Sequence, residues 1–290
     1  MTSRWNNPTG GFAYHLQALS RRGTLWAPCV REIARFLSAW APPEHTILLV
    51  GASGGHCLDL SFLSRFTRVV AVDFDPFAPW VFRWRARHLL GEGRTQLTWD
   101  ARDHLSPGRD GFDLAPLRAL LDAHPGAAVL FCNILGQLPL LGEDRDPEQD
   151  DDAPPAGSYE RWLLGLPEAL AGRSWASFHD RLSGPVRPHD IDSATPVPWS
   201  SSEELVRRHY PPTDDPELAL LDHRTSALCR DAPRVQLAWE LSPGLHHLLE
   251  AISFRAAPGA AGDRPSGSVD VADGEGGVAE PEALVAVAKL

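Results

Sequence analysis

Two features near the start of the chain combine residues that can hold a nucleotide-like ligand. The glycine-rich segment "GASGG", residues 51–55, directly follows the apolar run "TILLV" at 46–50. Glycines at such a turn allow unusual dihedrals and let backbone N–H groups approach a ligand closely. Asp73 ends the next apolar run, "RVVAVD". It lies roughly 20 residues beyond the first glycine, where an acid can hold ribose hydroxyls. Loop and acid together predict a site for an adenosine-containing cofactor.

A second set of polar residues follows two later apolar runs. Asn133 comes after "AAVLFC", and His179 and Asp180 come after "SWASF". His179 is a candidate general base because the unperturbed pKa of histidine lies near neutrality, with Asp180 beside it. Asn133 is a candidate for orienting an acceptor or cofactor, with capping of a turn as its alternative role. A hydrogen-bonded structural histidine is the alternative for His179.

No metal site is expected from the spacing of histidines, cysteines and acids. His246 and His247 are adjacent, and neighbouring residues on a strand face opposite sides, so they cannot bind one ion together. The four cysteines are far apart and include no CxxC pair. Buried free thiols in a reducing, cytoplasmic setting are therefore the expectation.

The elements that position these residues alternate between short apolar runs and amphipathic segments from residue 45 onward. Continuous apolar strands alternating with helices predict a doubly wound α/β fold with a mostly parallel sheet. We expect seven strands, and a helix in "HCLDLSFLSRF" directly after the glycine loop. Two final runs, "RVQLAWEL" and "LHHLLEAISF", are separated by Ser-Pro-Gly and predict an antiparallel hairpin at the end of the sheet.

The remaining segments differ in composition from this core. Residues 1–44 show helical periodicity and form an expected N-terminal helical segment, and residues 45–256 form the expected main domain. The main domain contains an acidic loop at 142–158 and an irregular, Pro-rich insert at 182–231. The insert carries one expected helix, "SSEELVRRHY", which begins with a capping box. Residues 257–290 are expected to be a flexible tail.

Composition limits the class of function. The 290-residue chain has 43% hydrophobic and 22% charged residues, typical of a globular protein, and a net charge of -11. That charge makes bulk nucleic acid an unexpected partner, because phosphate binding depends on clustered Lys and Arg. No apolar run is long enough for a membrane span. The sequence predicts no oligomeric state.

Taken together, these motifs resemble those of class I, Rossmann-like S-adenosylmethionine-dependent methyltransferases. In that family an acid precedes a Gly-x-Gly-x-Gly loop. Here Gly51 and Gly55 match the outer glycines, Ser53 replaces the middle one and Leu49 replaces the acid. The resemblance implies that Gly51, Ser53 and Gly55 shape the cofactor loop and that Asp73 holds the ribose. It also implies that Asp100 contacts the adenine and that Asn133 lies where cofactor and acceptor meet.

The expected function is methyl transfer from S-adenosylmethionine to a small-molecule or protein acceptor. A non-catalytic binding or regulatory protein on a methyltransferase scaffold is the alternative, motivated by Leu49 and Ser53. A nicotinamide-dependent oxidoreductase is a third hypothesis. Its G-x-G-x-x-G fingerprint is broken by Ser53 and His56. An antiparallel terminal hairpin within the sheet would argue against it.

Overall fold

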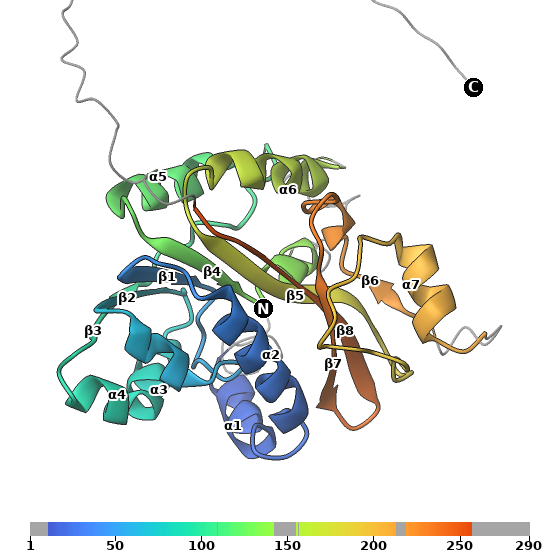
Figure 1. The fold of residues 1–290 in the computed structure, drawn as a ribbon, viewed down its shortest axis with the longest axis horizontal. Helices are drawn as coiled ribbons and strands as arrows, with labels where there is room; N and C mark the ends of the chain where they lie inside the picture. Colours follow the sequence, from blue (N-terminus) through green and yellow to red (C-terminus); the bar gives the residue numbers. More distant parts are fainter. Residues whose placement is uncertain (1–10, 109, 142–154, 156, 213–218, 257–290) are drawn as a thin grey trace, which may run out of the picture.

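The computed structural model describes residues 11–108, 110–141, 155, 157–212 and 219–256, and is built around one mixed sheet (Figure 1). The strands run in the order β3-β2-β1-β4-β5-β8-β7, with a short β6 paired to β5. Without β6 this is the 3-2-1-4-5-7-6 order of the class I methyltransferase fold, so the predicted fold class is confirmed. The strands are β1 (Thr46–Val50), β2 (Arg68–Val72), β3 (Gln96–Asp100), β4 (Ala128–Cys132), β5 (Trp175–Gly184), β6 (Leu221–Asp222), β7 (Val235–Ser242) and β8 (Leu245–Phe254).

Parallel and antiparallel pairing divide the sheet into two halves. β1 pairs in parallel with β2 and β4, β2 with β3, and β4 with β5. β8 pairs antiparallel with both β5 and β7, so the terminal hairpin lies within the sheet as predicted. The parallel half places the carboxyl ends of β1, β2 and β4 at one edge. Loops at that edge of an open α/β sheet form the usual ligand site.

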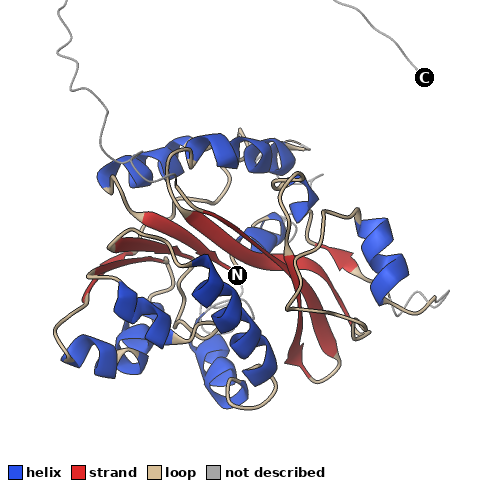
Figure 2. Cartoon of the chain, viewed as in Figure 1, coloured by secondary structure: helices blue, strands red, loops and turns tan. Residues whose placement is uncertain are grey.

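Helices cover both faces of the sheet (Figure 2). Strand residues alternate between two apolar cores, because successive side chains point to opposite faces. One core packs against the N-terminal helices and α3, and the other packs against α5 and α6. The α-helices are α1 (Gly11–Arg21), α2 (Ala27–Trp40), α3 (Ala78–Arg85), α4 (Arg87–Gly91), α5 (Ala115–Ala123), α6 (Ser158–Ala169) and α7 (Ser202–His209). The 3-10 helices are η1 (Leu60–Arg65), η2 (Leu135–Gln137), η3 (Pro139–Leu141) and η5 (Thr225–Ala227).

The predicted α-helix directly after the glycine loop is wrong. The chain stays irregular through Asp59 and then forms only the 3-10 helix η1. The Arg22 guanidinium donates hydrogen bonds to the carbonyl oxygens of His56 and Leu58, at 3.1 and 2.8 Å. Those carbonyls would have accepted the first bonds of an α-helix, so a side chain from the turn after α1 replaces helical hydrogen bonding here.

The strand β5 is longer than "SWASFHD" predicts. It continues to Gly184, so His179 and Asp180 lie inside the strand and not at its end. The extension is stabilised by antiparallel pairing with β8, with a register shift between Asp180 and Leu182. In the insert that follows, α7 begins with the predicted capping box between Ser201 and Glu204.

Most of the predicted acidic loop, 142–158, and all of the predicted tail, 257–290, lie outside the described residues. In the described part of the chain, no helix has the length and apolar character needed to cross a membrane.

Candidate functional site

The largest cavity at the site has a volume of about 380 Å³ and opens at the carboxyl ends of β1, β2 and β4. Four kinds of segment line it: α1, the glycine loop, the loops after β2 and β4, and the terminal hairpin. Its lining includes Gly11, Gly51, Ser53, Gly55, His56, Asp73, Asp75, Asn133, Gln137 and His247. The cavity therefore joins the predicted cofactor loop to the loop after β4.

The glycine loop adopts left-handed backbone conformations at alternate positions. Gly51, Ser53 and Gly55 have φ values of 72°, 46° and 66°. The loop turns back over the end of β2, where the Ser53 N–H donates to Asp73 Oδ2 at 2.7 Å. A left-handed backbone conformation is unfavourable for serine, which has a Cβ that glycine lacks. The short hydrogen bond from the Ser53 N–H to the Asp73 carboxylate offsets this strain.

Substituting Gly51 with Ala should destabilise the protein more than a left-handed backbone alone explains. A Cβ at Gly51 would lie 2.6 Å from Ile134 Cβ, whereas one at Gly126, which has the same φ of 72°, meets nothing within 4 Å. We expect about 1 kcal/mol lost for Gly126→Ala and about 3 kcal/mol or more for Gly51→Ala, measured by urea unfolding. Equal losses would contradict the steric role of Gly51.

Arginines hold the loop where the family motif has an acid. Leu49 is fully buried in the core of the sheet and makes no polar contact with the loop. Arg85, from α3, donates to the Gly54 carbonyl oxygen at 2.7 Å, and Arg22 binds the next two turns of the chain. Burial lowers the pKa of Arg85 to about 10, so its guanidinium stays charged at neutral pH. Two guanidinium groups thus bind backbone carbonyl oxygens within the loop and directly after it.

The first turns of α1 are attached to the same site. The Gly11 N–H donates to Asp75 Oδ2 at 2.6 Å, and His15 Nε2 lies 3.3 Å from that oxygen. The other ring nitrogen of His15 is 2.9 Å from His56 Nε2. His15 and His56 are each 1% exposed, so this chain of contacts is sealed from water. It fixes α1 across the cavity.

The His56 imidazole should make the fold sensitive to mild acid. Burial, with Arg85 and His15 nearby, lowers the pKa of His56 from 6.5 to about 3. The unfolded chain therefore binds more protons between these values, and stability falls as pH decreases from about 6.5 toward 3, by at most ~1.4 kcal/mol per pH unit. We expect the stability advantage of the wild type over His56→Gln to shrink across this window and stay constant above pH 7. If urea unfolding gives the same difference in unfolding free energy between wild type and His56→Gln at every pH, the prediction is contradicted.

The Asp73 carboxylate has hydrogen-bonding capacity left for a ligand. Oδ2 accepts the Ser53 N–H and Oδ1 accepts the Asp75 N–H, one bond for each oxygen. Burial raises the pKa of Asp73, against the lowering effect of these two amides. Each carboxylate oxygen can accept about two bonds, so two further donors, such as the hydroxyls of a ribose, fit this group.

A smaller cavity of about 30 Å³ adjoins the first and shares Gly51, Asp73, Phe74 and Ile134 with it. Its wall is the segment 102–106 after β3. Asp100, the predicted adenine contact, is not among the residues lining either cavity. Its carboxylate binds Arg102 Nη2 at 2.6 Å and His104 Nε2 at 3.1 Å. These partners, Arg102 above all, hold the pKa of Asp100 well below its usual range.

At the inner end of the large cavity, side chains from three elements converge on Asp180. Asn133 Nδ2 and Gln137 Nε2 donate to Asp180 Oδ2 at 3.1 and 2.8 Å. His247 Nδ1 lies 2.8 Å from Asp180 Oδ1. Burial alone would raise the pKa of this fully buried carboxyl, but His247, His223 and Asn133 together lower it to about 2. Asp180 is therefore ionised at neutral pH.

Asn133 is held in an unusual conformation at this point. Its φ is 56°, its N–H donates to the Phe178 carbonyl oxygen at 2.9 Å, and its Oδ1 is buried. That oxygen has no partner among the described residues. Because Asn133 lines the large cavity, a donor on a bound ligand could complete the hydrogen bonding of this oxygen.

Of the predicted site residues, Asn133 and Asp180 lie together and His179 lies apart from them. Adjacent residues on a strand face opposite sides of the sheet, so the His179 side chain points away from the side of Asp180 and the cavity. There its Nδ1 lies 2.9 Å from Ser177 Oγ. Burial, with Arg181 and Arg234 nearby, lowers the pKa of His179 to about 3.

Sequence reasoning missed His247, His223 and the contact of Gln137 with Asp180. One signal for His247 was available in the terminal hairpin. Antiparallel pairing of the last strand with β5 brings one of two adjacent histidines to the face of Asp180. His223 had no such signal, because it follows a two-residue strand inside the irregular insert.

Comparison with known proteins gives similarity of structure only. No family model and no curated protein matches the chain. It is similar to the N-methyltransferase NodS from Bradyrhizobium japonicum WM9, with 14% identity, 86% of this chain and 88% of that chain covered, and a TM-score of 0.37. It is also similar to magnesium protoporphyrin IX methyltransferase from Synechocystis PCC 6803, with 12% identity, 86% and 88% covered, and a TM-score of 0.39.

A third similar structure is the CcbJ methyltransferase from Streptomyces caelestis, at 16% identity and a TM-score of 0.32. That match covers 53% of this chain and 50% of CcbJ, so the chain spans about half the length of CcbJ. Assignment of the fold depends on the strand order and not on these scores. The chain has the strand order of the class I S-adenosylmethionine-dependent methyltransferase fold, and its similarity to members of that class is at low sequence identity.

Proposed function

We propose that the protein is an S-adenosylmethionine-dependent methyltransferase that acts on a small-molecule or protein acceptor. The observation that carries this proposal is the cavity of about 380 Å³, which places Asp73 and the glycine loop in the same space as Asn133 and His247. One part has the groups that suit an adenosine, and the other has polar groups directed at a second ligand.

The cofactor would be held by Asp73, whose carboxylate has room for two hydroxyl donors, and by the loop from Gly51 to Gly55. When bound, S-adenosylmethionine supplies an electrophilic methyl group on a sulfonium. Asn133 Oδ1, a buried acceptor without a partner among the described residues, would receive an N–H donor of the cofactor or of the acceptor. The residues present therefore fit this cofactor.

The charge of the cavity supports the same ligand class. Its described lining contains the carboxylates of Asp73 and Asp75 and no lysine or arginine. A cavity with negative charges favours a cationic cofactor and an acceptor that is neutral or cationic. Holding the acceptor atom in line with the methyl group would supply most of the rate enhancement, through proximity and orientation.

Calorimetric titration with S-adenosylmethionine and S-adenosylhomocysteine tests the proposal. Binding of both ligands, and none of NAD, is the expected result. No heat at millimolar ligand would instead favour a non-catalytic protein on this scaffold.

The nicotinamide hypothesis is already disfavoured by the structure, because β8 lies between β5 and β7 in the sheet. The four free cysteines support our expectation of a cytoplasmic location.

A further inference from the structure

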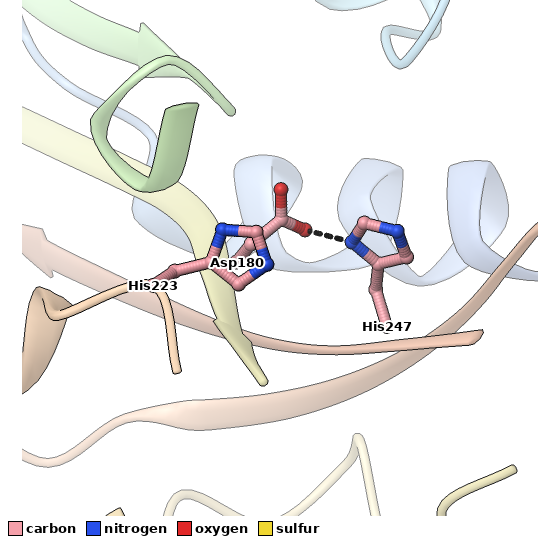
Figure 3. Close-up of side chains that lie close together, drawn as sticks. All are labelled: Asp180, His223 and His247. Atoms are coloured by element: carbon pink, nitrogen blue, oxygen red, sulfur yellow. Dashed lines mark hydrogen bonds and ion pairs between the residues drawn. The ribbon is translucent and has the colours of Figure 1, made fainter. Parts of the chain in front are cut away.

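We propose that Asp180, His223 and His247 form a binding site for a divalent transition-metal ion (Figure 3). One ligating atom from each of these side chains lies within 4.8 Å of the others. They come from β5, from the turn after β6 and from β8, so the cluster ties the central sheet to the insert. This inference is independent of the proposed methyl transfer.

The first support is the orientation of His223. Its Nδ1 lies 2.7 Å from the Gly136 carbonyl oxygen, which can only accept, so Nδ1 carries the proton. Nε2 therefore presents a lone pair and accepts from Ser183 Oγ at 2.9 Å. A metal-binding histidine usually donates one ring N–H to a backbone carbonyl or a carboxylate and coordinates the ion through its other ring nitrogen. The ion would displace the Ser183 hydroxyl.

The second support is the environment of Asp180. Asn133 and Gln137 both donate to Oδ2, which fixes the carboxylate as the outer contacts of a ligating carboxylate do. The carboxylate is fully buried, and its ion pair among the described residues is with His247. No lysine or arginine of the described chain is paired with it. Buried carboxylates are usually neutralised by a cation or a metal, and a divalent ion bound to Asp180 and His247 would take the place of the proton between them.

The ligand set selects the class of ion. Two imidazoles and one carboxylate suit Zn²⁺, Fe²⁺ or Co²⁺, whereas Ca²⁺ and Mg²⁺ require oxygen ligands. Bond lengths near 2.0–2.1 Å would bring the ligating atoms to about 3.3 Å from one another, so binding draws the three side chains together. Because His247 also lines the large cavity, the ion would lie next to the part of the cavity that contains Asn133.

Titration of the full chain with Co²⁺, after removal of metal by a chelator, tests the site. We expect one equivalent of Co²⁺ to bind and to give visible d–d absorption without a thiolate-to-cobalt charge-transfer band. Zn²⁺ should displace it. Failure to bind one equivalent at micromolar protein, or a spectrum with thiolate ligands from the four cysteines, would overturn the proposal.

Variants locate the ion. His223→Gln should weaken Co²⁺ binding at least 100-fold, and His247→Gln, at the cavity edge, provides a second test if the first variant does not fold. His246→Gln is the matched control, because it removes the neighbouring histidine on the opposite face of β8. Wild-type affinity in both folded test variants would refute the assignment. Titration of the metal-free wild type with S-adenosylhomocysteine reports on the proposed function separately.

Discussion

Replacing Asp73 with Ala should weaken binding of S-adenosylhomocysteine by about 100-fold or more. The Asp73 carboxylate at the end of β2 can accept two hydroxyl donors, and hydrogen bonds to a charged acceptor each contribute roughly 1.5–3 kcal/mol. The substitution also removes the acceptor of the Ser53 and Asp75 amides. Isothermal titration calorimetry measures the change in affinity.

Asp59→Ala is the matched control for Asp73→Ala. Asp59 also accepts a backbone amide close to the glycine loop, that of Ser61 at 3.0 Å, but it does not line the cavity. We expect it to cost about 1 kcal/mol of stability and to leave ligand affinity unchanged. If Asp73→Ala binds as tightly as this control, Asp73 does not hold the ribose.

The largest effect on stability is expected at Glu250, on the face of the sheet opposite the cavity. Glu250 Oε2 lies 2.8 Å from Arg234 Nη1 and 3.1 Å from Arg181 Nε, and all three side chains are fully buried. Glu250→Gln removes the negative charge that both guanidinium groups share. Breaking a buried ion pair from one side typically costs 3–5 kcal/mol, because uncompensated charge remains in the interior. Urea unfolding should show a loss of about this size.

Glu168→Gln provides the comparison on the surface. Its carboxylate lies 3.3 Å from Arg118 Nη2, and the two side chains are 80% and 50% exposed. Exposed pairs of this kind contribute about 0–1 kcal/mol. A Glu250→Gln protein whose unfolding free energy stays within 1 kcal/mol of the wild type would show that water or rearrangement neutralises the two arginines.

The local pattern of the sequence was sufficient for the fold class. Apolar runs such as "TILLV" and "AVLFC" identify buried parallel strands, because a strand covered on both faces has no polar side. The acid after β2 and the Ser-Pro-Gly turn between the last two strands were equally visible. Asp73 and Asn133 could be placed near one another because parallel strands end at one edge of a sheet.

Prediction failed where one segment's structure depends on a distant partner. The helix after the glycine loop does not form, since Arg22 takes its first carbonyl oxygens. β5 extends past Asp180 because β8 pairs with it. Neither partner is adjacent in the sequence, so no local periodicity reports the contact.

The sequence by itself determined the alternation of strands and helices and the residues at the ends of the strands. Only the tertiary structure decided which of two adjacent residues joins the cavity-lining side chains: Asp180 contacts Asn133 and His247, and His179 does not. It also decided that His223, from an irregular insert, joins Asp180 and His247. The physical reason is that a strand's period of two assigns neighbours to opposite faces without saying which face holds the site. That choice depends on strand register, a register shift after Asp180, and long-range packing.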